Sequence, residues 1–314
     1  MGRALQIARI ADREKTADRL LRSSADKFYD PEVDIDWDAP LADGKIFQPE
    51  HRCSLYGTPL WDRLSPEQRI ELGKHETASV ASVGLWFELV LMQALLKEAY
   101  RSDPTRRHAQ YALTEIADEC RHSVMFARAI ERFGVPAYGP PPALHRLARL
   151  FSTVTWGPAM YGAILVAEET LDRLQREAMA DETLQPLIRM VNRIHVLEEA
   201  RHVTFARQEV VRGMGSLSKA ELFYQRGVIA YVSFLVMRSM INPRLYRAVG
   251  LDPRQARRAA MANPRYQETV RWSGERIMAF LQEVGLVGAP GMRWWRRSFL
   301  LPADASQATG ATAG

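Results

Sequence analysis

Two copies of one pattern, an acidic residue followed by Glu-x-x-His, stand 80 positions apart in this chain of 314 residues. The first copy runs from Asp118 to His122 and the second from Glu198 to His202. A Glu and a His three positions apart share one face of a helix. Two such pairs, with one further Glu from each of two other helices, form the ligand set of dinuclear carboxylate sites in four-helix bundles. The pattern therefore predicts a helical bundle that holds two metal ions.

The surroundings of the two pairs favour this interpretation over a solvated helix face, which is what a single Glu-x-x-His pair usually represents. Both pairs lie among apolar residues with helical periodicity, including Ile116 and Val124 near the first and Ile194 and Val203 near the second. Burying ionised Glu and His side chains without partners is costly, and bound metal ions remove that cost.

Glu88 is the first candidate for a further carboxylate, because it lies in the apolar stretch of residues 83–92. The helix break at residues 102–104 comes 14 to 16 positions after Glu88 and 15 to 17 positions before Glu119. An antiparallel hairpin would place both side chains at the same height. Glu76 is nearly twice as far from the break, so we reject it as a ligand.

Glu168 is the corresponding candidate in the second hairpin. The break near residues 180–183 lies 12 to 15 positions beyond Glu168 and 16 to 19 positions before Glu199. The heights match to within about one helical turn. The adjacent Glu169 is an alternative, which the sequence separates from Glu168 only weakly.

His195 adds a feature that a minimal site lacks. His195, Glu199 and His202 stand at positions i, i+4 and i+7, so at about 100° per residue they fall within roughly 60° of arc and can face the same cluster. The alternative is a core histidine that is hydrogen bonded to a carbonyl group.

The full spacing, Glu-x(30)-Glu-x-x-His followed by Glu-x(26)-His-x-x-x-Glu-x-x-His, resembles the p-aminobenzoate N-oxygenase family of non-haem di-iron enzymes. The resemblance covers roughly residues 60 to 245. It implies a di-iron monooxygenase with two iron ions, or manganese as a substitute, and dioxygen as co-substrate. It also implies seven metal ligands, which are Glu88, Glu119, His122, Glu168, His195, Glu199 and His202.

The same resemblance implies oxidation of an amine, for example of an arylamine to a hydroxylamine, nitroso or nitro product. No short motif marks the substrate-contacting residues, so the substrate stays open. The alternatives are a di-iron hydroxylase or desaturase that acts on carbon, which shares every ligand except His195, and a non-catalytic iron-binding bundle.

The acidic residue that precedes each pair predicts a supporting network. We expect it to accept a hydrogen bond from the histidine of the other pair, Asp118 from His202 and Glu198 from His122, which would fix the tautomer of each ring. The arginine inside each pair would neutralise the same network.

We expect an all-α, ferritin-like four-helix bundle with additional covering helices. Capping boxes at Ser65 and Ser218 and a C-cap glycine at Gly134 mark helix ends. The expected bundle helices span residues 65–101, 105–133, 158–180 and 182–212, and the covering helices span 218–241, 253–261 and 264–284.

The expected domain organisation has three parts. They are an irregular N-terminal segment (1–60), the di-iron helical bundle domain (61–300) and a disordered tail (301–314).

Charge and composition bound the partners. The net charge is +5, and residues 244–297 are rich in arginine, which indicates a solvated basic surface or a docking site for an acidic partner such as an electron-donating ferredoxin. No nucleic-acid-binding motif accompanies the charge. The longest apolar run, 227–237, is too short to cross a bilayer, no secretory signal is visible, and the two cysteines suggest a reducing compartment. We expect a cytoplasmic homodimer without membrane or nucleic-acid partners.

Overall fold

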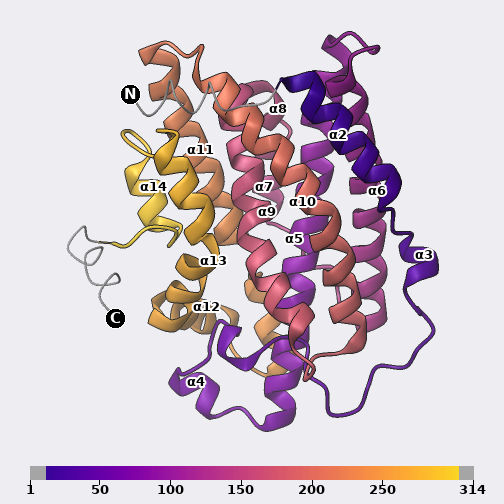
Figure 1. Ribbon diagram of the computed structural model, residues 1–314. Helices are drawn as coiled ribbons and strands as arrows, with labels where there is room; N and C mark the ends of the chain where they lie inside the picture. Colours follow the sequence, from indigo (N-terminus) through magenta and orange to yellow (C-terminus); the bar gives the residue numbers. More distant parts are fainter. Residues whose placement is uncertain (1–11, 304–314) are drawn as a thin grey trace, which may run out of the picture.

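Four long helices form the centre of the fold (Figure 1). The computed structural model describes residues 12–303, and this part of the chain contains helices and no β-strand. The central helices are α5 (Pro66–Arg101), α6 (Arg107–Phe133), α9 (Gly157–Ala180) and α10 (Pro186–Met214). α5 packs along α6, α9 packs along α10, and α10 also contacts α6. The predicted all-α, ferritin-like bundle is confirmed.

Local capping explains where these helices begin and end. The Ser65 side chain accepts from the backbone N–H of Gln68, whose side chain accepts from the backbone N–H of Ser65, so the predicted capping box is present. Gly134 ends α6 with φ 68°. α10 begins four positions later than predicted, because Asp181 caps a turn at Thr183 and Pro186 occupies the first helical turn.

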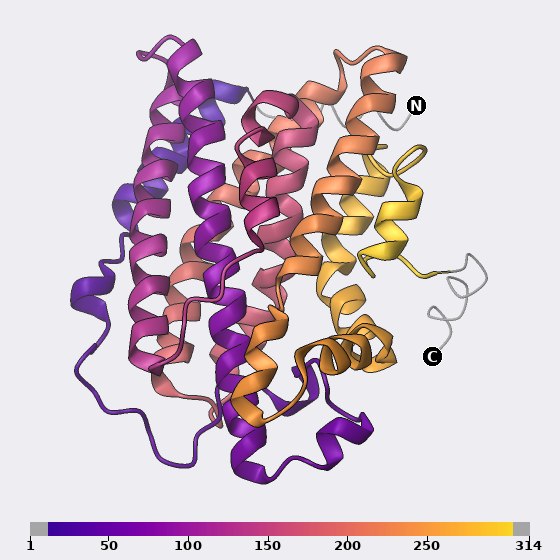
Figure 2. The same ribbon diagram turned by 180° about the vertical axis from the view of Figure 1, so that it is seen from behind.

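Additional helices cover the bundle (Figure 2). α11 (Lys219–Ser239) and α13 (Pro264–Glu283) pack against α9, and α14 (Met292–Arg297) packs against α11. The shorter elements are α3 (Pro31–Asp34), η1 (Glu50–Arg52), α4 (Pro59–Asp62), α7 (Pro142–Ala148), α8 (Phe151–Val154), η2 (Pro243–Val249) and α12 (Pro253–Ala262). The predicted covering helices are therefore present within one or two residues of their expected ends.

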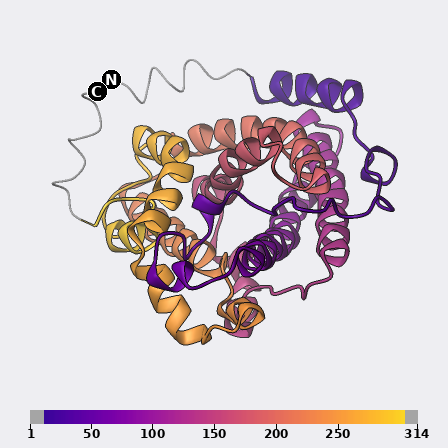
Figure 3. The ribbon, with the colours of Figure 1, turned by 90° about the horizontal axis from the view of Figure 1, so that it is seen from below.

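The N-terminal segment differs from the expectation that residues 1–60 are irregular. Within it, α2 (Arg13–Asp26) is a regular helix that packs on the outside of α6 and α10 (Figure 3). Its buried side chains, Ala17 and Leu20 among them, are few, and the helix as a whole is strongly polar. The domain boundaries themselves stay a prediction, and most of the expected tail, residues 304–314, lies outside the described residues.

α5 bears on the expectation that the chain does not cross a membrane. Among the described residues it is the one helix that is long and apolar enough by length and composition. However, 56% of that apolar window is buried inside the protein, and Glu88 points inward from it. α5 is therefore a core helix of the bundle.

Candidate metal centre

Both Glu-x-x-His pairs face the interior, one from α6 and the other from α10. Glu119, His122, Glu199 and His202 are each at most 3% exposed. Nδ1 of His122 lies 3.1 Å from Oε2 of Glu119 and 3.3 Å from Oε1 of Glu199. Nδ1 of His202 lies 3.0 Å from Oε1 of Glu199 and 3.1 Å from Oε1 of Glu119. Each imidazole thus faces carboxylates from both helices.

The three other predicted ligands join the same cluster. Nε2 of His195 lies 3.5 Å from Oε1 of Glu88 and 3.8 Å from Oε1 of Glu199. Potential donor atoms of Glu168, His195 and Glu199 lie within 4.8 Å of one another, as do those of Glu88, His122 and His195. The structure therefore brings together all seven residues that the sequence predicts as ligands.

The geometry also separates Glu168 from its neighbour. Glu168 is 4% exposed and belongs to the cluster. Glu169 points elsewhere, since both of its carboxylate oxygens accept hydrogen bonds from the guanidinium group of Arg207, one of them at 2.7 Å. Glu168 is the better candidate for a ligand.

Glu76 lies outside the cluster, as expected from its distance to the helix break. Its carboxylate accepts hydrogen bonds from the backbone N–H of Ser54 at 3.0 Å, from the Ser54 hydroxyl at 2.5 Å and from Nε2 of Gln48 at 2.9 Å. Burial raises its pKa, and these hydrogen bonds oppose that shift.

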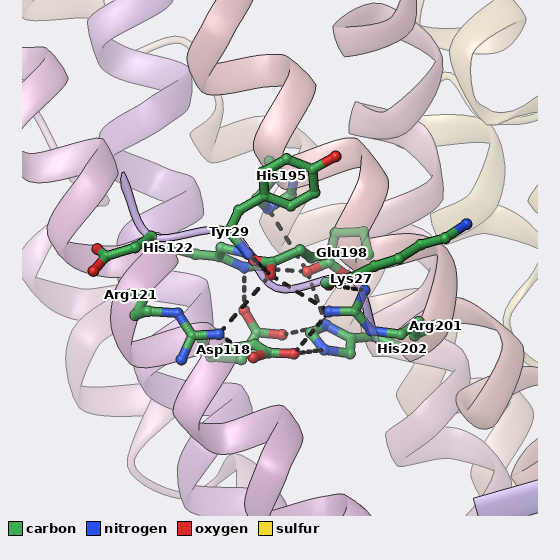
Figure 4. Close-up of polar contacts among 12 residues, drawn as sticks. Lys27, Tyr29, Asp118, Arg121, His122, His195, Glu198, Arg201 and His202 are labelled. Atoms are coloured by element: carbon green, nitrogen blue, oxygen red, sulfur yellow. Dashed lines mark hydrogen bonds and ion pairs between the residues drawn. The ribbon is translucent and has the colours of Figure 1, made fainter. Parts of the chain in front are cut away.

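The expected crossed pairs are confirmed (Figure 4). Nε2 of His122 lies 2.9 Å from Oε2 of Glu198, and Nε2 of His202 lies 3.2 Å from Oδ2 of Asp118. Each contact joins α6 to α10. Because the acidic partner holds Nε2 of each ring, Nδ1 is the nitrogen that faces the cluster.

The two arginines neutralise this network, again as expected. Nη2 of Arg201 lies 3.2 Å from Oδ2 of Asp118 and 3.5 Å from Oε1 of Glu198, and Arg121 also pairs with Asp118. Although burial opposes ionisation, the hydrogen bond with His202 and the two arginines lower the pKa of Asp118 to about 2. The segment after α2 covers the network, since the backbone N–H of Tyr29 donates to Oε1 of Glu198.

Gln175, which no sequence motif marked, orients His195. Nδ1 of His195 lies 3.0 Å from Oε1 of Gln175. An amide oxygen only accepts, so this contact places the ring proton on Nδ1 and leaves the lone pair of Nε2 toward the cluster. Burial lowers the pKa of His195 to about 4, which keeps the ring neutral at neutral pH. The sequence could have indicated Gln175 only through its position, because it follows Glu168 by seven residues and so lies on the same face of α9.

Glu115 is a second residue that the sequence analysis missed. It lies one turn before Glu119 on α6, is 2% exposed, and offers a donor atom within 4.8 Å of those of Glu119 and His202. Burial raises its pKa to about 8. A carboxyl group at this position supports the cluster from one side.

The arrangement of the donor atoms suits bound metal ions better than hydrogen bonding among the side chains themselves. Burial raises the pKa of Glu88 and of Glu168 well above the usual value, and nearby carboxylates add to both shifts. Among the described residues, Oε2 of Glu88, Nε2 of His195 and Oε2 of Glu199 are buried without a hydrogen-bond partner. Such atoms are costly unless a cation or a proton satisfies them. Mixed carboxylate and imidazole donors suit iron and related transition metals.

A cavity of about 170 Å³ adjoins one side of the cluster. Glu88, Glu168 and His195 are among the residues that line it. Its walls come from the four bundle helices, from α11 and α13, and from the segment 47–52 that includes η1. They are mostly apolar, including Val80, Phe87, Phe126, Leu171, Val191 and Met237. A small molecule in this cavity would lie directly against three of the seven clustered residues.

Comparisons with known proteins agree with this geometry. A family model described as P-aminobenzoate N-oxygenase AurF matches residues 10–285, a span that includes all seven clustered residues. An uncharacterised protein of Mycobacterium tuberculosis strain ATCC 25618 / H37Rv is 30% identical over 250 residues, which cover 76% of this chain and 72% of the relative. An uncharacterised protein of Mycobacterium bovis shows the same identity and coverage.

Proposed function

Because the chain belongs to the p-aminobenzoate N-oxygenase family, we propose that it is a di-iron oxygenase that uses dioxygen to oxidise the nitrogen of an amine. One observation carries the proposal. Four carboxylates and three imidazoles from four helices converge on one buried point, and Oε2 of Glu88, Nε2 of His195 and Oε2 of Glu199 are among their atoms that lack a hydrogen-bond partner in the described part of the chain.

The seven clustered residues would hold two iron ions. Glu119 and Glu199 each face both His122 and His202, so they occupy the centre of the cluster. When bound, the two irons supply the redox chemistry that activates dioxygen. Manganese as a substitute has no support beyond the chemistry of the ligands.

The protein itself contributes orientation, dryness and charge balance. The crossed pairs hold His122 and His202 with Nδ1 inward, and Gln175 holds His195 with Nε2 inward. The cluster is buried, so water is largely excluded from it. The acidic partners of the two histidines are paired with arginines, which leaves the charge of the four clustered carboxylates to be balanced by metal ions.

His195 favours oxidation at nitrogen over the carbon-oxidising alternative. In the resemblance described above, this third histidine distinguishes the N-oxygenase family from di-iron hydroxylases, and here its free nitrogen is aimed at Glu88 and Glu199. The position of His195 therefore supports a role as a ligand rather than as a core histidine.

Aerobic turnover of the ferrous protein with a panel of arylamines tests this proposal. We expect oxygen from isotopically labelled dioxygen at the nitrogen, with full retention of deuterium on a ring-deuterated substrate, because no carbon–hydrogen bond is broken. Mass spectrometry reads both outcomes. Loss of ring deuterium, or oxidation of aliphatic substrates alone, would assign the protein to the carbon-oxidising class.

The partners belong to the same proposal. Reductive activation of dioxygen needs an electron donor, and the arginine-rich region of residues 244–297 would suit an acidic ferredoxin or reductase. Part of this charge already has a structural role, since Arg257 donates to the backbone carbonyls of Arg238 and Ile241. A homodimer in the cytoplasm is the setting that we propose.

A further inference from the structure

The cavity beside the cluster restricts the substrate of the proposed reaction. We propose that it admits an uncharged, apolar arylamine and discriminates against arylamines that carry a carboxylate, p-aminobenzoate included. The amine part of this inference rests on the proposed function. The preference for a neutral, apolar body rests on the cavity alone.

The size and the walls of the cavity suit an aromatic ring. Its volume is about 170 Å³, and aromatic walls come from Phe87 on α5 and from Phe126 and Phe133 on α6. An apolar cavity of roughly 150 Å³ is enough to bind benzene. A substrate ring would therefore replace weakly bound water or empty space with apolar contacts.

The cavity contains no cation that is free to receive a carboxylate. Among the described residues that line it, Arg52 is the only lysine or arginine. Its guanidinium group is already paired with both oxygens of Glu177, from Nε at 2.8 Å and from Nη2 at 3.1 Å. It also lies 3.9 Å from the ring centre of Trp272. The charge of Arg52 is thus satisfied in place.

The ion pair between Arg52 and Glu177 also lies far along α9 from the clustered residues. Glu177 follows Glu168 by nine residues on α9, which corresponds to a rise of about 13 Å. An amine nitrogen held next to Glu168 would place the para substituent of a single ring between the two ends, among the apolar walls. A carboxylate at that point would be buried without a free cation to balance its charge, which is unfavourable.

The carboxylates that line the cavity add to this discrimination. Glu76 is buried in the wall of the cavity, and its carboxylate oxygens already accept hydrogen bonds from Ser54 and Gln48. Its carboxylate would therefore repel a bound anion. An aliphatic amine is a poor reactant for a separate reason, because it is protonated at neutral pH and has no free lone pair. A neutral arylamine meets both conditions.

Calorimetric binding of a matched pair of probes to the iron-containing protein under anaerobic conditions tests the proposal without turnover. The probes are p-aminobenzoate and its methyl ester. The extra methyl group accounts for about a 4-fold difference in affinity. We expect the ester to bind at least about 30-fold more tightly than the acid. Binding of the acid as tightly as the ester, or binding of neither, would overturn the proposal.

Glu177→Gln tests why the acid is rejected. This substitution leaves the Arg52 charge unpaired, so a longer acid, 4-(4-aminophenyl)butanoate, should bind at least about 10-fold more tightly than to the wild type. The affinity for its methyl ester should not change. The control Asp172→Asn removes a carboxylate on the same helix that pairs with Arg176 outside the cavity, and should leave both affinities unchanged.

An unchanged affinity for the longer acid in Glu177→Gln would overturn the assigned role of the ion pair. The proposed function has a separate outcome. An ester that binds tightly but gains no oxygen at nitrogen during aerobic turnover would contradict N-oxygenation and leave the inference about the cavity standing.

Discussion

Gln175 determines which nitrogen of His195 faces the carboxylates. Gln175→Leu removes the acceptor for the Nδ1 proton, so the ring loses both its tautomer and its orientation. We expect the affinity for ferrous iron to fall about 10- to 100-fold, which is typical of lost outer partners of metal-binding histidines. Anaerobic competition titration with a chelator measures it. Gln175→Glu retains an acceptor oxygen and should lose less, whereas equal affinities in wild type and Gln175→Leu would show that this contact does not orient a ligand.

Glu76 gives the stability of the metal-free protein a measurable pH dependence. Burial raises its pKa in the folded state above its unfolded value near 4.5. In the pH range between these two values the folded state holds one more proton, so its contribution to stability falls as pH rises. Glu76→Gln cannot titrate. The variant should therefore become more stable relative to wild type as pH rises from the unfolded pKa of Glu76 to its raised folded-state pKa.

Urea unfolding of the metal-free proteins at several pH values measures this difference. Glu67→Gln is the control of opposite sign, because the Ser65 hydroxyl lowers the pKa of Glu67 and the wild-type carboxylate gains stability as pH rises. A pH-independent difference between Glu76→Gln and wild type would contradict the raised pKa.

Single residues also show how far the sequence could predict the site. The Glu-x-x-His pairs were predictable because helical spacing alone places a Glu and a His on one face. Glu88 stood out because it interrupts an apolar stretch. Glu115 and Gln175 belong to no such pattern, and only the packing of α6 and α9 shows that they face the cluster.

At the level of helices, Gly134 ends α6 in a left-handed conformation. Its φ is 68°, and a Cβ atom at this position would meet no atom within 4 Å. Gly134→Ala therefore introduces backbone strain without a clash. We expect a loss of about 1 kcal/mol in the free energy of unfolding, measured with urea. Gly215→Ala, at the exposed end of α10 with φ −66°, is the control and should cost much less.

The helix ends that were predicted correctly are those fixed by local chemistry. Capping boxes and C-cap glycines act within a few residues, so they can be read directly from the sequence. α2 was missed because the segment is strongly polar overall, and its few buried side chains show their role only where the helix packs against α6 and α10. α10 begins later than predicted because the turn before it also forms a backbone bridge between Leu184 and Ile46, which are distant in the sequence.

For the whole molecule, the two hairpins combine into one buried cluster with a cavity on one side. The sequence predicted the fold class and the height of the cluster in the bundle, because the number of residues between each ligand and the nearest helix break is similar on paired helices. The cavity could not be predicted in this way, because its walls also come from α11, α13 and the segment 47–52, which lie outside the bundle. Its low polarity depends on how α11 and α13 pack over α9.

The iron content of the purified protein tests the central claim most directly. Because the carboxylates and imidazoles converge at one level, elemental analysis should find about two iron ions per chain. Glu119→Ala and Glu199→Ala should each abolish the pair, whereas Glu169→Gln, which alters the neighbouring carboxylate that pairs with Arg207, should retain it. Full iron occupancy in both alanine variants would contradict the assignment of this cluster as a di-iron site.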